Sequence, residues 1–276
     1  MKKSRRHALG QHFLASRGIL DRIAAAAAPI PGETILEIGS GKGALTLSLL
    51  ASGARIVAVE KDPVLAQGLK ADAHEGLTVI EGDILDVDWA ELMKAQGAGD
   101  GPYLVTGNLP YSISSPILFR LLDQRLFFRK AVFLVQKEVA ERFIAGPGGK
   151  DYAPLGILLQ IYFAVKILFK VAPGSFVPPP RVDSAVVSLE RREAPLVEVG
   201  DFDRFRRFVN ACFAQRRKTL SNNLAAAGYP HDGVFAALDS LGLDHRVRAE
   251  QIPVASLLEI SRLLASPYTG RPNPLQ

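Results

Sequence analysis

Four consecutive residues, Asn108-Leu109-Pro110-Tyr111, combine groups that could hold one flat ring carrying an amine. The amide oxygen of Asn108 can accept a hydrogen bond from an exocyclic amine. Pro110 has a fixed φ and favours extended geometry at Leu109, so the Leu109 carbonyl can be held in one direction. Tyr111 offers a flat face for stacking. The alternative is an ordinary surface turn, because Asn and Pro are common turn residues.

A predicted strand ends at this segment. Residues 103–105 are an apolar run of strand character, and Gly107 precedes Asn108. In an open α/β sheet, ligands bind at the carboxyl ends of the strands. Strands and helices alternate on both sides of the segment, which predicts a Rossmann-like, doubly wound, mostly parallel sheet. Two long strands at 161–171 and 182–189, joined by a proline-rich link, predict an antiparallel pair at the sheet edge.

Acidic residues stand at the ends of the other predicted strands. Glu37 precedes the glycine-rich loop 39–43, and Glu60 and Asp83 close the next two strands. The glycines let the backbone approach a ligand, and an acid after the second strand can hold both hydroxyls of a ribose. The glycine spacing differs from the dinucleotide fingerprint. We therefore favour S-adenosylmethionine (AdoMet), with Asp83 accepting from the adenine amine, over a dinucleotide.

Composition limits the class of protein. The chain has 276 residues, of which 48% are apolar and 22% charged, as in globular proteins. The uncharged stretch 152–165 is too short to span a bilayer, and the basic N-terminus lacks the apolar core of a secretory signal. The single cysteine, Cys212, cannot form an internal disulfide, and the histidines lack metal-ligand spacing. These features predict a cytoplasmic protein with no membrane contact and no metal.

The positive charge is concentrated at one end of the chain. Residues 1–22 carry six lysines and arginines and one acid, which accounts for the formal net charge of +5. A basic arm on a neutral body suggests contact with a polyanion such as nucleic acid, although a solvated tail is the alternative. From residue 201 onward the apolar period is helical, which predicts helices at 202–209, 216–227, 233–241 and 254–265. We therefore expect a catalytic domain at 1–195, including this arm, and a small all-helical RNA-binding domain at 196–276.

These motifs together resemble those of the rRNA adenine N6-dimethyltransferases, a family of class I AdoMet-dependent methyltransferases. The resemblance spans nearly the whole chain and rests on residues 10–14, 37–41, 60, 82–83, 108–111 and 175–186. It implies cofactor contacts at His12, Leu14, Gly39, Gly41, Glu60, Asp83 and Asn108. It also implies catalytic roles for Asn108, Leu109, Pro110, Tyr111 and Phe176. Phe176 is expected beside the target base.

The family has two branches with different substrates. One dimethylates two adjacent adenosines near the 3′ end of small-subunit rRNA, and the other methylates one large-subunit adenine and gives antibiotic resistance. The segment 215–224 resembles the first branch, so we expect a monomer acting on small-subunit rRNA within an immature 30S-type particle during ribosome assembly. The predicted phosphate contacts are Lys2, Lys3, Arg5, Arg6, Arg216, Arg217 and Lys218.

Three alternatives to this interpretation stay open. One is the large-subunit enzyme of the resistance type. Another is a largely non-catalytic assembly factor that only binds RNA. The third is an NAD-dependent dehydrogenase, although this chain lacks the third glycine at the spacing typical of that class and has no clear hydride-transfer site.

Overall fold

The computed structural model describes residues 12–264, and these form two compact units. The described part of the first unit comprises 12–144 and 162–194. The second comprises 145–161 and 195–264. Residues Gly10 and Gln11 of the N-terminal motif, and the basic side chains before them, lie outside the described residues. None of the described helices is long and apolar enough to cross a membrane.

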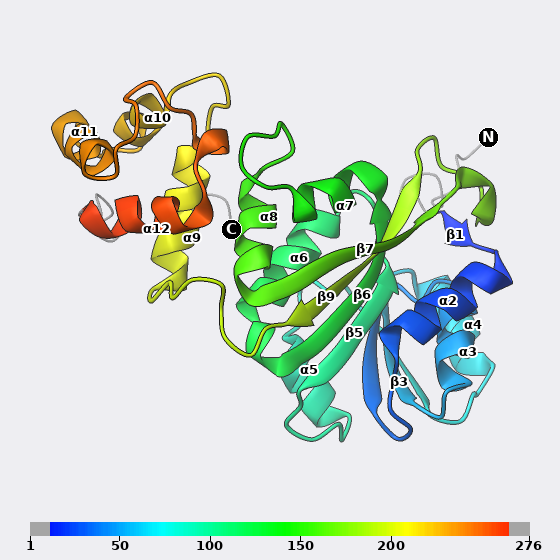
Figure 1. The fold of residues 1–276 in the computed structure, drawn as a ribbon. Helices are drawn as coiled ribbons and strands as arrows, with labels where there is room; N and C mark the ends of the chain where they lie inside the picture. The colour runs from blue at the N-terminus through cyan, green and yellow to red at the C-terminus, as the bar shows by residue number, and fades with distance from the viewer. Residues whose placement is uncertain (1–11, 265–276) are drawn as a thin grey trace. The chain divides into compact units, whose positions relative to one another are not determined.

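The first unit is built on a seven-stranded sheet (Figure 1). Its strands run in the order β4, β3, β2, β5, β6, β9, β7. Their bounds are Leu77–Glu81, Arg55–Glu60, Thr34–Ile38, Tyr103–Asn108, Phe128–Gln136, Ser184–Arg191 and Phe163–Val171. The first five are parallel, and β9 is antiparallel to both β6 and β7. The predicted fold class and the antiparallel pair around the proline-rich link are therefore confirmed.

Helices cover both faces of this sheet. Figure 1 shows α2 and α3 on one face and α5 and α6 on the other. The helices of the first unit are α2 (Arg17–Ala27), α3 (Ala44–Leu50), α4 (Pro63–Ala71), α5 (Trp89–Ala95), α6 (Ser114–Asp123) and α7 (Lys137–Ile144). Strands β2 and β5 are buried along almost their whole length, as expected for central parallel strands covered on both sides. The loops at their carboxyl ends therefore rest on a rigid base.

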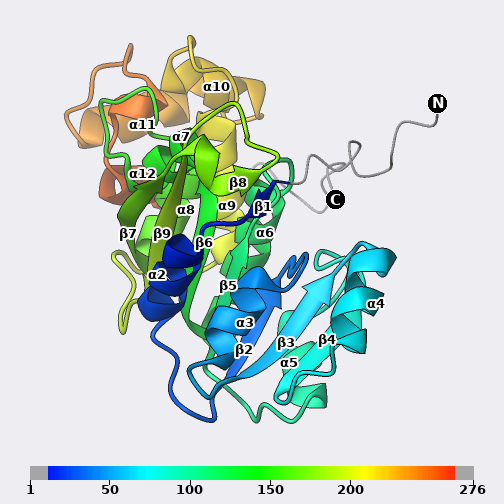
Figure 2. The ribbon, with the colours of Figure 1, turned by 90° about the vertical axis from the view of Figure 1, so that its right-hand side faces the viewer.

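A second, two-stranded sheet lies outside the main one. Strand β1 (Phe13–Leu14) pairs antiparallel with β8 (Phe176–Val177), and the Ala15 amide donates to the Ser175 carbonyl at 2.8 Å. Figure 2 shows β1 beside β8. The pairing ties the segment before α2 to the proline-rich link between β7 and β9. Two-residue strands carry no periodic signal, so the sequence does not predict them.

The second unit is helical. Its helices are α8 (Pro154–Tyr162, of which Tyr162 falls in the first unit), α9 (Phe202–Cys212), α10 (Leu220–Ala226), α11 (His231–Ser240) and α12 (Val254–Leu263). The helix expected from Arg216 starts only at Leu220, because the Thr219 hydroxyl accepts from the Asn222 amide and caps the helix there. The prediction that Arg216 lies on a helix is therefore wrong. Helix α8 was not predicted, since its sequence shows neither the helical nor the strand periodicity of apolar residues clearly.

Candidate active site

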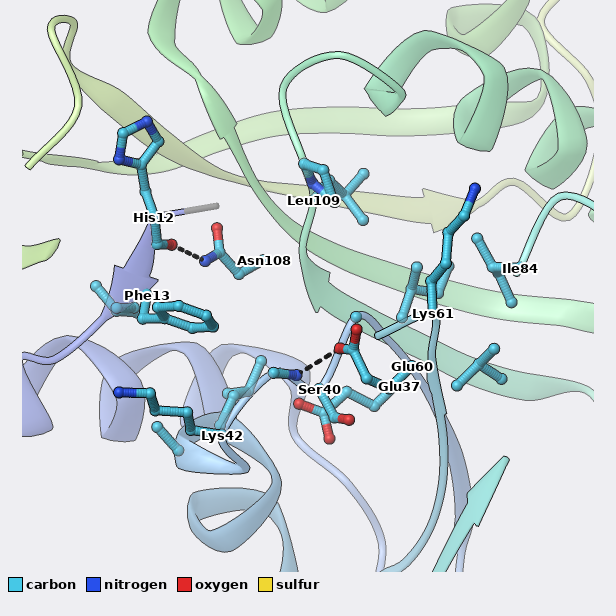
Figure 3. A pocket seen from close by; sticks show the side chains of 18 of the residues that line it. His12, Phe13, Glu37, Ser40, Lys42, Glu60, Lys61, Ile84, Asn108 and Leu109 are labelled. Atoms are coloured by element: carbon cyan, nitrogen blue, oxygen red, sulfur yellow. Dashed lines mark hydrogen bonds between the residues drawn. The ribbon is translucent and has the colours of Figure 1, made fainter. Parts of the chain in front are cut away.

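A cavity of about 510 Å³ opens at the carboxyl ends of β2, β3, β4 and β5 in the first unit. It lies where the sequence places a ligand site. All but one of the predicted site residues line it, namely His12, Leu14, Gly39, Gly41, Glu60, Asp83, Asn108, Leu109, Pro110 and Tyr111. Figure 3 shows side chains that line this cavity. The exception is Phe176.

Glu60 braces the glycine loop from the end of β3. Its carboxylate is 4% exposed, and it accepts from the Gly41 amide at 2.8 Å and from the Asp62 amide at 2.9 Å. Gly39 and Gly41 have φ values of 70° and 58°, in the left-handed region that favours glycine. Each carboxylate oxygen keeps a further lone pair. Glu60 can therefore hold the loop and still accept from ribose hydroxyls in the cavity.

We expect Glu60→Ala to weaken AdoMet binding by about 1–3 kcal/mol, because ribose hydroxyls would lose their acceptor and the loop its brace. Isothermal titration with AdoMet measures this loss. RNA binding should stay nearly unchanged. Glu81→Ala, which removes an exposed acid at the end of β4 outside the cavity lining, is the matched control. Unaltered AdoMet affinity in Glu60→Ala would remove Glu60 from the ribose site.

Glu37 is a buried acid at the floor of the same cavity, with 1% of its surface exposed. Burial raises the pKa of Glu37 to about 7, while the hydrogen bond from Thr46 lowers it and the charge of Glu60 raises it further. The Thr46 hydroxyl donates at 2.6 Å. The Glu37 carboxyl group therefore exchanges its proton close to neutral pH, and a cationic ligand nearby would favour its ionised form.

Asp83 is held by two donors just after β4. The Lys61 ammonium donates to its Oδ2, and the Leu85 amide donates to its Oδ1 at 3.0 Å. Partial burial would raise the pKa of Asp83, but these hydrogen bonds and the Lys61 charge hold it below its usual value. Asp83 is therefore an ionised acceptor. Sequence reasoning did not single out Lys61, whose only signal is its place directly after Glu60.

Asn108 ends β5 with its amide in a fixed orientation. Its Nδ2 donates to the His12 carbonyl at 2.9 Å (Figure 3). Because a carbonyl can only accept, this contact assigns the amide nitrogen and leaves Oδ1 on the other side. Within residues 12–264, no hydrogen-bond donor to that oxygen is present. The predicted acceptor is thus available to a ligand amine.

The residues after Asn108 are also fixed by neighbouring elements. The Leu109 amide donates to the Leu134 carbonyl at 3.0 Å, which continues the pairing of β5 with β6. The Tyr111 hydroxyl lies 2.6 Å from the Ser184 hydroxyl at the start of β9. Burial raises the pKa of Tyr111, and the Ser184 contact opposes this only in part. Tyr111 therefore presents a neutral phenol ring whose hydroxyl is held by the Ser184 hydroxyl.

Phe176 does not reach the cavity in this structure. Its ring is 2% exposed and packs in the core of the first unit, in register with Leu14. The next residue, Val177, lines the cavity and is 63% exposed. Alternation along β8 explains the difference, because successive side chains point to opposite faces of a strand. The role of Phe176 beside the target base stays a prediction, and sequence reasoning missed Val177.

Comparison with known proteins decides the family. Residues 2–266 match the description "Ribosomal RNA adenine dimethylase". The chain belongs to this family. Its members transfer methyl groups from AdoMet to adenine in ribosomal RNA, which confirms the predicted enzyme class and cofactor and excludes a dehydrogenase.

Individual relatives agree with this family. "Ribosomal RNA small subunit methyltransferase A" of Geobacter sulfurreducens is 46% identical, over 95% of this chain and 96% of the relative. The protein of the same name from Xanthomonas campestris is 43% identical, over 92% and 94%. Among solved structures, a dimethyladenosine transferase from Plasmodium falciparum has a TM-score of 0.74 and 28% identity, covering 90% of this chain and 96% of that one. The 23S rRNA methyltransferase ErmE has a TM-score of 0.67 and 29% identity, with coverage of 91% and 99%.

Proposed function

We propose that this protein dimethylates the N6 amines of two adjacent adenosines near the 3′ end of small-subunit rRNA, using AdoMet, during ribosome assembly. The free acceptor on Asn108, beside the AdoMet-sized cavity, is the observation that carries the proposal. Relatives named for the small subunit are 43–46% identical to the chain, against 29% for the 23S enzyme, which favours the small-subunit substrate. We further propose that the protein acts in the cytoplasm as a monomer on an immature 30S-type particle.

The cavity residues fit AdoMet part by part. Glu60 offers acceptors to the ribose, and ionised Asp83 offers one to the adenine amine. The glycines with left-handed backbone leave room for the methionine part of AdoMet. At Gly41 the space is already narrow, because an added Cβ would lie 3.2 Å from the Phe13 ring. Leu14 and the His12 backbone close the cavity from the N-terminal side. When bound, AdoMet supplies a methyl group activated by a positively charged sulfonium.

The chain's own residues prepare the adenine amine. The nitrogen is a weak nucleophile because its lone pair is delocalised into the ring. Asn108 Oδ1 and the Leu109 carbonyl would accept its two hydrogens and favour a pyramidal nitrogen, which frees the lone pair. Tyr111 would stack on the base after it leaves its helix or loop. Positioning therefore supplies most of the acceleration.

The direct test is methylation of small-subunit rRNA. Immature small subunits from cells lacking the protein should gain N6,N6-dimethyladenosine when incubated with the protein and AdoMet, as read by mass spectrometry. Large subunits treated in the same way serve as the comparison. Methylation of large-subunit rRNA would favour the resistance-type enzyme, and binding without methyl transfer would favour an assembly factor.

The RNA contact is proposed for the loop before α10, in the second unit. Gln215, Arg216, Arg217 and Lys218 line a concave surface there. Arg216 is held in place, because its guanidinium donates to the Lys150 carbonyl and to Glu250 Oε2, the latter at 3.2 Å. Cations on a capped, braced loop can meet phosphates without large loss of conformational freedom. The basic side chains before residue 12 are proposed as further phosphate contacts.

Arg217→Gln with Lys218→Gln should weaken binding to immature small subunits and flatten its salt dependence, by roughly 0.7–0.9 in log–log slope for each phosphate that the loop no longer neutralises. Both side chains are exposed, so the fold should not change. Binding at several salt concentrations measures the slope. The control is Arg55→Gln with Lys70→Gln, which removes two exposed cations from the first unit. An unchanged slope would mean that this loop is only a solvated surface.

A further inference from the structure

The imidazole ring of His12 is fixed beside the catalytic segment. Its Nδ1 lies 2.8 Å from the Pro178 carbonyl, and because a carbonyl only accepts, Nδ1 carries the hydrogen. The backbone is also held on the C-terminal side of His12, since the His12 carbonyl accepts from Asn108 and Phe13 pairs with Val177. The ring therefore has one orientation, set by the proline-rich link.

This ring does not face the predicted ribose end of the cavity. Figure 3 shows it projecting away from the carboxylates of Glu37 and Glu60, on the far side of Asn108. Its aromatic neighbour is Tyr111, with ring centroids 5.8 Å apart and planes inclined by 31°. Both residues line the cavity. The His12 side chain thus belongs to the same region as the ring expected to stack on the target base.

The spacing of the two rings determines how a base can meet them. A flat base held between two parallel rings needs a separation of about 7–8 Å, twice the contact distance between carbon atoms. The observed 5.8 Å is too small for this. A base stacked on Tyr111 must therefore lie beside the space between the two rings and not inside it. The imidazole then contacts the edge of the base or the periphery of its face.

We propose that the His12 imidazole is a substrate-positioning group: it contacts the target adenine and, together with Tyr111, sets the plane in which Asn108 Oδ1 meets the amine. This inference rests on the proposed function. It assigns the two parts of His12 to different partners. The backbone carbonyl orients Asn108 next to the cofactor, while the side chain serves the RNA base.

Two substitutions separate the ring from its hydrogen bond. His12→Asn keeps a donor for the Pro178 carbonyl but removes the aromatic ring, whereas His12→Phe keeps a ring and removes the donor. We expect His12→Asn to lower methyl transfer at limiting RNA by about five- to tenfold, the lower part of the range for removing an aromatic side chain that meets a base. His12→Phe should recover most of that loss. AdoMet affinity should change less than twofold in both.

The measurements are titration with AdoMet and single-turnover methylation of immature small subunits at saturating AdoMet. His74→Asn, which removes a histidine outside the cavity lining, is the matched control and should behave as wild type. The proposal is overturned if His12→Asn weakens AdoMet binding but leaves RNA-dependent rates unchanged, or changes neither. It is also overturned if His12→Phe is as impaired as His12→Asn. Failure of the wild-type protein to methylate the particle would instead contradict the proposed function and remove the basis of this inference.

Discussion

Asn108→Ala should reduce methyl transfer by at least about 100-fold while the protein still binds AdoMet, since comparable losses follow removal of one preorganised polar group at a reacting centre. The structure gives the reason: Nδ2 is engaged with the His12 carbonyl, and Oδ1 is left for the amine. Single-turnover methylation of immature small subunits measures the rate, and titration measures AdoMet affinity.

The control for this substitution is Asn210→Ala, which removes an exposed asparagine from α9 and should leave both quantities unchanged. Near-normal methylation by Asn108→Ala would contradict the catalytic assignment. A parallel fall in AdoMet affinity would mean that Asn108 serves both ligands, which its place in the cavity lining permits.

Gly107→Ala should lower the free energy of unfolding by about 3 kcal/mol or more, at the upper end of the range for overpacking a core. An added Cβ would lie 2.4 Å from the Ile38 carbonyl oxygen on the neighbouring strand β2. That oxygen belongs to the backbone and cannot rotate away as a side chain could. Urea unfolding followed by circular dichroism measures the loss.

Gly68→Ala is the matched comparison for this prediction. Gly68 lies within α4, and an added Cβ there would meet nothing within 4 Å. This variant should therefore be more stable than wild type by about 0.5–1 kcal/mol, because glycine weakens a helix interior. If Gly107→Ala unfolded at the wild-type urea concentration, the close approach of β2 and β5 would not constrain position 107.

Local patterns in the sequence were enough to predict the main sheet and most of the cavity. A parallel sheet brings the carboxyl ends of its strands to one edge, so Glu60, Asp83 and Asn108 could be placed together from their positions after three apolar runs. Strand β2 ends directly before the glycine loop, β3 ends at Glu60, and β4 ends two residues before Asp83, as predicted. The position and the end of a buried strand can be predicted from a few residues, because its apolar run and the glycines beside it are local in the sequence.

Contacts between distant segments could not be predicted in this way. Asn108 and His12 are 96 positions apart, and their hydrogen bond depends on the small β1–β8 sheet, which no periodicity marks. The same sheet decides that Val177 faces the cavity and Phe176 the core. The resemblance predicts Phe176 near the site, but the side that its ring faces depends on the register of two very short strands.

The place of β9 in the main sheet has a consequence for synthesis of the chain. Strand β7 is made before β9, yet β9 is its only strand neighbour in the sheet, and β9 also covers the free edge of β6. In a nascent chain that has not yet reached residue 184, the edges of β6 and β7 that β9 will cover are therefore open, and such edges are templates for aggregation. The link 172–183 allows β7 and β9 to pair as a hairpin, and docking of β9 on β6 then covers both of these edges and leaves β7 as an outer strand of the sheet.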